Sequence, residues 1–250
     1  MKISIITVVY NAESYIKGCI DSVLTQDYQN IEYIIIDGGS TDNTCAIIEP
    51  YLKKIHHFSS EKDRGMYDAL NKGIAIATGE LVGILNADDT LASKSVISKI
   101  AKFYTEVNTE GVYGNLNYVN ANNPSHVIRK WVSKQFNINH IKQGWMPAHP
   151  TLYLKRALFA KYGNYSLDYG TAADYELMIR FLYRFQVKAH YLDQLFVKMR
   201  VGGMSNSSSK QRYLAFINDY KAAKINGIPF PLLTIIRKKL SKIAQFLSKN

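Results

Sequence analysis

The chain of 250 residues is long enough for one sizeable α/β domain followed by a tail. Its composition, 47% hydrophobic and 20% charged, is that of a globular protein and excludes a disordered, collagen-like or fibrous chain. The net charge of +11 predicts an anionic partner, for which nucleic acids, anionic lipid surfaces and phosphorylated substrates are the candidates.

Residues 3–9 are β-branched and almost continuously apolar, which predicts a strand that is covered on both faces. We expect Asn11 to cap the helix that follows. Residues 33–36 and 81–85 predict two further buried strands, and the Gly- and Ser-rich turn at residues 38–42 leads into another helix. Strands separated by helices of this length predict right-handed βαβ units and a mostly parallel sheet.

The second half of the chain is more irregular. Its patterns predict strands at residues 112–119 and 151–154 and a helix at residues 173–185. A Gly- and Ser-rich loop follows at residues 202–209, and two more helices are predicted at residues 211–226 and 232–250.

Two features of the sequence bear on the cellular compartment. Cys19 and Cys45 are too few for a disulfide framework and form no C-x-x-C pair, so we interpret them as thiols in a reducing compartment. The apolar run at residues 3–9 is too short for a signal peptide, and no stretch approaches the ~20 apolar residues needed to span a bilayer. We expect a cytoplasmic protein, peripheral on the inner face of the cell membrane.

Polar residues follow the ends of three predicted strands. Tyr10 and Asn11 come after the first strand, Asp37 ends the second, and Asn-Ala-Asp-Asp at residues 86–89 follows the third. Ligands of parallel sheets bind beyond the carboxyl ends of the strands. The sequence therefore predicts one ligand-binding crevice at these ends, although each acidic residue taken alone is equally typical of a solvated, helix-capping turn.

The acidic segment at residues 86–89 has no basic residue beside it. Adjacent carboxylates are costly to hold together unless they bind a cation or separate into solvent. Hard oxygen ligands suit Mg²⁺ or Mn²⁺, which share the phosphates of a nucleotide and stabilise a diphosphate leaving group. The segment therefore predicts a site for one of these two metals.

Four ordered motifs, at residues 7–11, 36–42, 63–73 and 85–89, resemble those of inverting glycosyltransferase family 2. Bacterial surface-polysaccharide enzymes are the members most similar in pattern. The resemblance covers about residues 1–205 and implies a GT-A (Rossmann-like) α/β fold with a mostly parallel central sheet flanked by helices. It also implies a domain organisation. Residues 1–115 would form a nucleotide-sugar-binding half, residues 116–205 an acceptor half and residues 206–250 a helical C-terminal extension.

The resemblance implies a role for each matching position. The residues implied to bind the nucleotide-sugar are Thr7, Val9, Tyr10, Asn11, Asp37, Arg64, Asn86, Ala87, Asp88 and Asp89. Asp37 would contact the base and Asp89 the donor sugar. Asn86 stands where the family's D-x-D motif commonly has Asp, and an Asn can bond a ribose hydroxyl but is a weaker metal ligand. We therefore place the metal on Asp88.

An inverting transfer needs a carboxylate that deprotonates the acceptor hydroxyl. Asp174 starts a predicted helix, where an N-cap is the alternative interpretation, and the resemblance implies that it is this general base. Glu176, two residues further on, is the second candidate.

Four more side chains are candidates for contacts with donor or acceptor. Trp145 would stack on a sugar, and His149 would meet a phosphate or the metal unless it is structural. Arg200 and the Gly- and Ser-rich loop after it would close over the diphosphate as a lid. For Arg64, a surface ion pair with Asp63 is the alternative to a nucleotide contact.

The C-terminal helix is amphipathic and basic. Its apolar stripe comprises Leu233, Ile236, Leu240, Ile243 and Leu247. Such a helix is typical of one that lies in a membrane interface, and docking on the core or pairing in a homodimer are the alternatives. An anionic membrane surface fits an acceptor that is a glycan or is linked to a polyprenyl lipid.

We therefore predict a metal-dependent hexosyltransferase that moves a sugar from a nucleotide-sugar, UDP-linked by preference, to an acceptor hydroxyl in cell-surface polysaccharide synthesis. A nucleotidyltransferase acting on sugar phosphates is the alternative, but it would show a Gly-rich basic loop after the first strand, where this chain has Tyr10-Asn11-Ala12-Glu13. The basic residues gather in the tail without interleaved exposed aromatics, so we expect no nucleic-acid partner.

Overall fold

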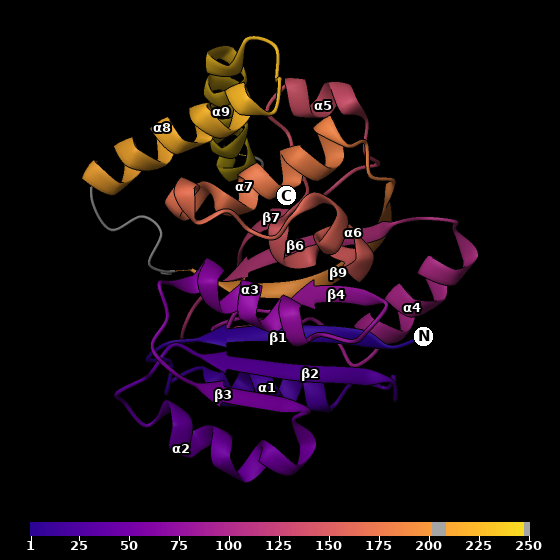
Figure 1. Cartoon of the computed structure of the whole chain (residues 1–250), viewed down its shortest axis with the longest axis vertical. Coiled ribbons are helices and arrows are strands. Elements are labelled where there is room, and N and C mark those ends of the chain that lie inside the picture. Colours follow the sequence, from indigo (N-terminus) through magenta and orange to yellow (C-terminus); the bar gives the residue numbers. More distant parts are fainter. Residues whose placement is uncertain (202–208, 248–250) are drawn as a thin grey trace.

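The computed structural model describes residues 1–201 and 209–247. A curled sheet crosses the middle of the molecule with helices on both of its faces (Figure 1). The strands are β1 (Ile3–Val9), β2 (Ile31–Asp37), β3 (His57–Ser60), β4 (Leu81–Ile84), β5 (Thr90–Leu91), β6 (Gly111–Val119), β7 (Val127–Trp131), β8 (Tyr153–Lys155) and β9 (Ala189–Arg200). The longer helices are α1 (Ile16–Leu24), α2 (Thr44–Ile48), α3 (Met66–Ile76), α4 (Val96–Glu106), α5 (Ile138–Lys142), α6 (Arg156–Tyr162), α7 (Ala173–Met178), α8 (Ser209–Ile225) and α9 (Pro231–Leu247).

The sheet has the strand order β3-β2-β1-β4-β8-β6-β9-β5, with β7 paired to β6. In the first half, β1 runs parallel to β2 and β4, and β2 runs parallel to β3, as the sequence predicts. The second half turns the sheet into a mixed one, because β8 lies antiparallel to both β4 and β6. A strand as short as β8 carries no pattern that reveals its direction.

The continuous apolar run of β1 is explained by two separate cores. Ile3 and Ile5 face a cluster with α1 and α4, whereas Ile6 and Val8 face a cluster with α3, α6 and α7. Successive side chains of a strand point to opposite faces, so a strand between two cores is largely apolar, and the buried hydroxyls of Ser4 and Thr7 are hydrogen-bonded.

The C-terminal helices are part of the second core. Ala222 and Ile235 are fully buried in the cluster that contains α7. Thr234 Oγ1 donates a hydrogen bond of 2.9 Å to the carbonyl of Lys142. One face of α9 is thus docked on the protein, which is one of the alternatives to a membrane helix that the sequence leaves open. The domain boundary predicted near residue 205 stays a prediction.

Two sequence expectations differ from the structure, and a third falls almost wholly outside the described residues. Asn11 does not cap α1, which begins at Ile16 after Tyr15. The helix predicted at residues 173–185 is α-helical only over α7 and continues as a π-helix, Ile179–Arg184. The lid predicted at residues 202–209 lies outside the described residues, apart from its last residue, which begins α8.

Candidate active site

The carboxylate of Asp37, at the end of β2, organises the loop that follows it. Oδ2 accepts hydrogen bonds from the backbone N–H groups of Gly39 and Ser40 at 3.1 and 2.9 Å, and from Ser60 Oγ at 2.6 Å. Burial alone would raise the pKa of Asp37, but the bonds from Ser40 and Ser60 outweigh it and lower the pKa. Asp37 is therefore a buried, ionised acceptor for its own loop, and no part of it is exposed.

Asn11 connects the end of β1 to the same loop. It has a positive φ of 48°. Its Oδ1 accepts the backbone N–H of Thr41 at 2.8 Å, and its own backbone N–H is donated to Ser40 Oγ at 2.8 Å. Asn tolerates the left-handed conformation better than most residues, so Asn11 fixes this loop in place of capping a helix.

The remaining residues of the first motif differ in what they present to a ligand. Thr7 and Val9 are buried, and the Thr7 hydroxyl lies 3.2 Å from the hydroxyl of Tyr33 inside the core. Tyr10 is 55% exposed just beyond the strand end. Among these three side chains, Tyr10 is the one that a nucleotide can reach.

Arg64 lies at the start of α3 with its side chain largely in solvent. Its guanidinium pairs with Asp68 at 3.0 Å, so the ion-pair alternative holds with Asp68 as partner and not Asp63. Asp63 instead accepts the backbone N–H of Gly65 at 2.7 Å. A Cβ added to Gly38 would lie 2.6 Å from the Asp63 carboxylate, so a larger residue there would require the Asp63 side chain to move.

The acidic segment after β4 is hydrogen-bonded to the C-terminal end of β9. Asn86 Nδ2 donates to Asp89 Oδ2 at 2.9 Å, and the backbone N–H of Arg200 donates to Asp89 Oδ1 at 3.3 Å. The Arg200 guanidinium bonds the carbonyl of Asp88 at 2.6 Å. Asp89 is buried, as is Ala87, whereas Asp88 is half-buried. Arg200 is thus a clamp on this segment in the described structure.

The two acids of this segment suit a divalent cation. Burial raises the pKa of Asp88, and burial together with the charge of Asp88 raises that of Asp89 well above its usual range. The described residues contain no group of three His, Cys, Asp or Glu side chains able to hold a metal by themselves. An Mg²⁺ or Mn²⁺ ion at Asp88 would therefore take most ligands from water and phosphates, the usual arrangement for these ions.

Asp174 lies at the start of α7 among aromatic side chains. Its Oδ1 accepts the backbone N–H of Tyr175 at 2.6 Å, but the N-cap residue of α7 is Ala172, so Asp174 is not the cap, and its side chain is half-buried. Burial raises the pKa of Tyr67 and of Tyr165, and the charge of Asp174 adds to both shifts. The two tyrosine rings lie 5.4 Å apart.

His149 belongs to the Asp174 side of the site. Its Nε2 lies 2.7 Å from the hydroxyl of Tyr165. Burial lowers the pKa of His149, and the charge of Asp174 opposes that shift. A neutral imidazole beside the Asp174 carboxylate fits a role in holding Tyr165 and Asp174 rather than the predicted contact with a phosphate.

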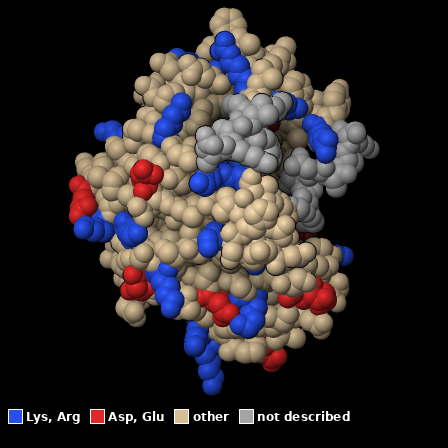
Figure 2. Space-filling view, turned by 180° about the vertical axis from the view of Figure 1, so that it is seen from behind, with Lys and Arg blue, Asp and Glu red and all other residues tan. Residues whose placement is uncertain are grey.

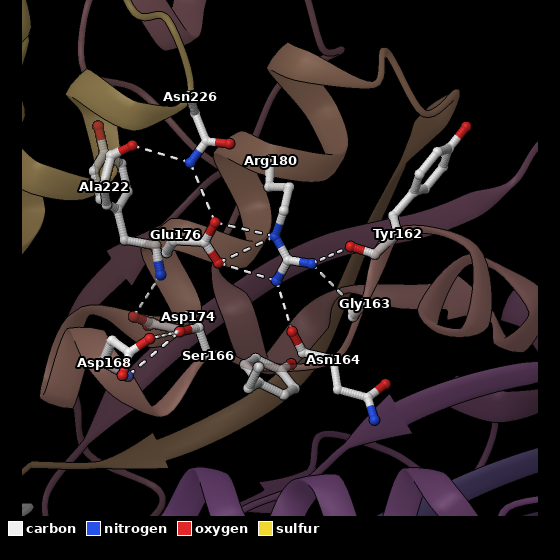
Figure 3. A network of polar contacts seen from close by, with 12 residues as sticks. Tyr162, Gly163, Asn164, Ser166, Asp168, Asp174, Glu176, Arg180, Ala222 and Asn226 are labelled. Atoms are coloured by element: carbon white, nitrogen blue, oxygen red, sulfur yellow. Dashed lines mark hydrogen bonds and ion pairs between the residues drawn. The ribbon is translucent and has the colours of Figure 1, made fainter.

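The carboxylate of Glu176 forms a buried ion pair with Arg180 (Figure 3). Its Oε2 lies 3.0 Å from Arg180 Nη2, and Asn226 Nδ2 donates to Oε1 at 3.2 Å. Arg180 also donates to the backbone carbonyls of Tyr162, Gly163 and Asn164. Because these bonds occupy the carboxylate, Glu176 is a structural residue, and Asp174 remains as the candidate base.

Trp145 packs inside the protein rather than lining the site. Its ring makes edge contacts with Tyr113 and His140, with centroids 6.3 and 5.5 Å apart. The ring, which is partly buried, takes part in the packing of α5 against the sheet, and its contact with a sugar stays a prediction.

Tyr118, near the end of β6, was not among the expected site residues. Burial raises the pKa of its phenol, Arg129 opposes the shift, and the charges of Asp89 and Asp174 both add to it. A tyrosine within a predicted strand carries no signal of such a position.

The structure matches solved glycosyltransferases of the GT-A fold over nearly its whole length. S. aureus TarS, residues 1–349, in complex with UDP-GlcNAc superposes with a TM-score of 0.72 and 20% identity, covering 99% of this chain and 72% of TarS. The mannosyltransferase PcManGT from Pyrobaculum calidifontis, in complex with GDP-Man and Mn²⁺, gives a TM-score of 0.67 at 19% identity, covering 95% and 68%. The chain is therefore a glycosyltransferase domain in fold.

The sequence comparisons identify the family. The family described as Glycosyl transferase family 2 matches residues 4–170. A PGL/p-HBAD biosynthesis glycosyltransferase of Mycobacterium bovis is 28% identical over 216 residues, which are 84% of this chain and 82% of the relative. An uncharacterized glycosyltransferase of Mycobacterium tuberculosis is 30% identical over 180 residues, covering 71% and 68%. The chain belongs to glycosyl transferase family 2.

Two further observations concern the extent of the family match and the helices of the chain. The family match ends before Asp174, so the role of that residue stays a prediction that rests on the site around it. Within the described residues, no helix combines the length and apolar character needed to cross a membrane.

Proposed function

We propose that this family 2 glycosyltransferase transfers a sugar, with inversion, from a nucleotide-sugar to an acceptor hydroxyl, and that Asp174 is its general base. The observation that carries the proposal is the acidic segment after β4, where the backbone N–H of Arg200 donates to Asp89 Oδ1 at 3.3 Å and the Arg200 guanidinium bonds the carbonyl of Asp88 at 2.6 Å. An inverting transfer needs in addition a base that accepts the proton of the acceptor hydroxyl.

Each residue then has a task in one displacement. Asp174 takes the proton of the acceptor hydroxyl as its oxygen attacks the anomeric carbon and the nucleoside diphosphate leaves from the opposite face. The loop ordered by Asp37 and Asn11, together with exposed Tyr10, borders the nucleoside. A Mg²⁺ or Mn²⁺ ion held by Asp88 would neutralise the departing diphosphate.

The donor and acceptor are proposed from the relatives. TarS was solved with UDP-GlcNAc and PcManGT with GDP-Man, and a mycobacterial relative is named for PGL/p-HBAD biosynthesis. These names support a UDP-sugar or similar donor and a cell-surface glycan or lipid-linked acceptor for this chain.

We also propose that α9 attaches the protein to an anionic membrane surface. Leu233, Ile236 and Leu240 are 43%, 43% and 58% exposed, while Thr234 and Ile235 are docked on the protein. Leu233, Ile236 and Leu240 of the predicted stripe thus face outward, beside exposed Arg237 and Lys239. In Figure 2, Lys and Arg side chains extend over the upper part of the molecule, whereas the visible Asp and Glu side chains lie mainly lower. A homodimer through the same stripe is the competing explanation.

The test is a panel of UDP-, GDP- and TDP-sugars with Mn²⁺ or Mg²⁺, in which released nucleotide is measured for the wild type and for Asp88→Ala. We expect metal-dependent hydrolysis of one donor by the wild type and its loss in the variant. The absence of turnover and of any nucleotide-induced thermal shift across the panel would refute the proposal.

A further inference from the structure

Phe230, in the turn between α8 and α9, is an aromatic residue in the left-handed backbone conformation. Its φ is 51°, and its side chain is 78% exposed, more than any other large hydrophobic side chain in the part of the chain that the structure describes. A positive φ is an outlier for a bulky residue, because the Cβ then crowds the following carbonyl oxygen. Phe230 is thus a strained residue whose ring gains little packing within the protein.

The backbone on either side fixes this conformation. Before the turn, Ile228 is 3% exposed in the core and donates its backbone N–H to the carbonyl of Ala223 at 3.0 Å. After the turn, the carbonyl of Phe230 accepts the backbone N–H of Thr234 at 3.0 Å. Pro231 begins α9, where its missing N–H leaves no bond unmade. The ring of Phe230 is therefore carried outward on a turn that is held at both ends.

Exposed apolar side chains lie on both sides of Phe230 in the chain. Ile225, Leu232 and Leu233 are 64%, 51% and 43% exposed. α8 and α9 lie at one end of the molecule, away from β2 and β3 (Figure 1). An aromatic ring with exposed aliphatic neighbours suits the boundary between the headgroups and the acyl chains of a bilayer.

The charges around the turn have a single sign. Residues 220–250 contain no Asp or Glu, and Lys224 and Arg237, which precede and follow the turn, are exposed. An anionic lipid surface complements these cations, whereas a second copy of the same end of the molecule would bring like charges together. Charge complementarity therefore favours lipid as the partner of this surface.

We propose that the turn between α8 and α9 enters the bilayer and that the Phe230 ring is its anchor among the acyl chains. This inference rests on the membrane attachment proposed above and adds the segment that penetrates the lipid. Asn or Gly would adopt a positive φ with less strain. The phenylalanine at this position thus serves the contact with lipid at the expense of the fold.

The substitution Phe230→Asn tests this assignment, because stability and lipid binding should change in opposite directions. Asn tolerates a positive φ, so we expect the variant to unfold at a higher denaturant concentration than the wild type. Its dissociation constant for vesicles of phosphatidylcholine and phosphatidylglycerol should rise about tenfold, since an aromatic ring no longer enters the lipid. Gln186→Asn is the matched control. Gln186 is exposed with a φ of 50°, so the same change should stabilise the fold and leave vesicle binding unaltered.

The substitution Phe230→Trp measures the depth of insertion. We expect lipids brominated in their acyl chains to quench the emission of the introduced indole, beyond any quenching seen in the wild type. Leu52→Trp changes an exposed residue of the first half of the chain, and its indole should not be quenched.

Three results overturn the inference and leave attachment through the α9 stripe standing: unchanged vesicle binding by Phe230→Asn, a loss of stability in that variant, or an unquenched indole in Phe230→Trp. A change confined to the mass measured by sedimentation equilibrium without lipid would assign the ring to a second copy of the chain, and it also overturns the inference. A wild type that does not sediment with the vesicles would refute the membrane attachment itself.

Discussion

The backbone N–H of Arg200 lies 3.3 Å from Oδ1 of Asp89, a residue 111 positions earlier in the chain. The same arginine bonds the carbonyl of Asp88 through its side chain, and its guanidinium lies 5.2 Å from the ring of Tyr15. The end of β9 therefore lies against the acidic segment and holds the backbone of Asp88, the proposed metal ligand.

Arg200→Lys is expected to weaken metal-dependent donor binding, because lysine lacks the guanidinium fork that reaches both the Asp88 carbonyl and Tyr15. The Mn²⁺-dependent thermal shift produced by UDP should need about tenfold more nucleotide in the variant, the loss of one strong hydrogen bond. Lys198→Gln, on the same strand, is the control. An unchanged UDP titration would show that Arg200 does not orient the metal ligand.

Asp174→Asn is expected to lower the transfer rate between about 10²- and 10⁴-fold, since an amide cannot accept the acceptor proton. Donor binding should remain, because Asp174 is on the acceptor side. Initial rates of transfer and the UDP-induced thermal shift measure the two effects. Asp168→Asn, an exposed acid six residues earlier, should keep the wild-type rate. Full activity of Asp174→Asn would remove it as the base.

Glu176→Gln is expected to destabilise the fold by about 3 kcal/mol, because it leaves the buried Arg180 guanidinium without its carboxylate. Chemical denaturation gives the free energy of unfolding. The control is Glu106→Gln, which breaks the exposed pair with Lys102 and should change that free energy by no more than about 0.5 kcal/mol. Similar small effects in both variants would contradict the structural role of Glu176.

Glu32 makes the free energy of unfolding depend on pH in the acidic range. Burial alone would raise the pKa of Glu32, but hydrogen bonds from Ser4, Thr78 and Gly79 lower it. A lowered folded-state pKa means that the contribution is complete above the unfolded value of about 4.3 and disappears as the pH falls through the folded value. Glu32→Gln should therefore lower the free energy of unfolding at pH 7 by about 1–3 kcal/mol and by less below pH 4. A pH-independent difference would contradict this assignment.

Membrane attachment through α9 predicts that Ile236→Ser with Leu240→Ser reduces sedimentation with anionic vesicles by about tenfold or more, since two exposed apolar side chains no longer enter the interface. Leu52→Ser with Ile76→Ser replaces equally exposed residues of the first half and should have no effect. If the α9 variant instead changes only the mass measured by sedimentation equilibrium without lipid, the stripe is a dimer interface.

The donor side of the site could be predicted from sequence because each of its residues follows a buried strand. β1, β2 and β4 are largely apolar and buried, and Asn11, Asp37 and Asp88 lie at or shortly after their ends. The acceptor side could not be predicted in the same way. Its residues come together through the pairing of β6 with β7 and β9, and nothing in the sequence fixes which strands pair or in which register.

Residue type also misled at individual positions. Thr7 matches the family motif, but alternation along β1 turns its side chain into a core with Tyr33. Trp145 has an aromatic ring of the kind that stacks on sugars, and this ring packs against Tyr113. Glu176 and Asp174 are indistinguishable as acids in the sequence, and only the ion pair with Arg180 separates them.

The hydrogen bond from Asn226 to Glu176 has a consequence for how the protein can be shortened. It ties the turn after α8 to α7, two residues from Asp174. A chain trimmed to the span shared with the family, residues 4–170, would lack Asp174, and one that ends before Asn226 would lose a partner of the ion pair beneath it. A truncation that removes both α9, which we propose for lipid attachment, and Asn226 would therefore also weaken the scaffold around Asp174, and measurements on such a chain would report both losses together.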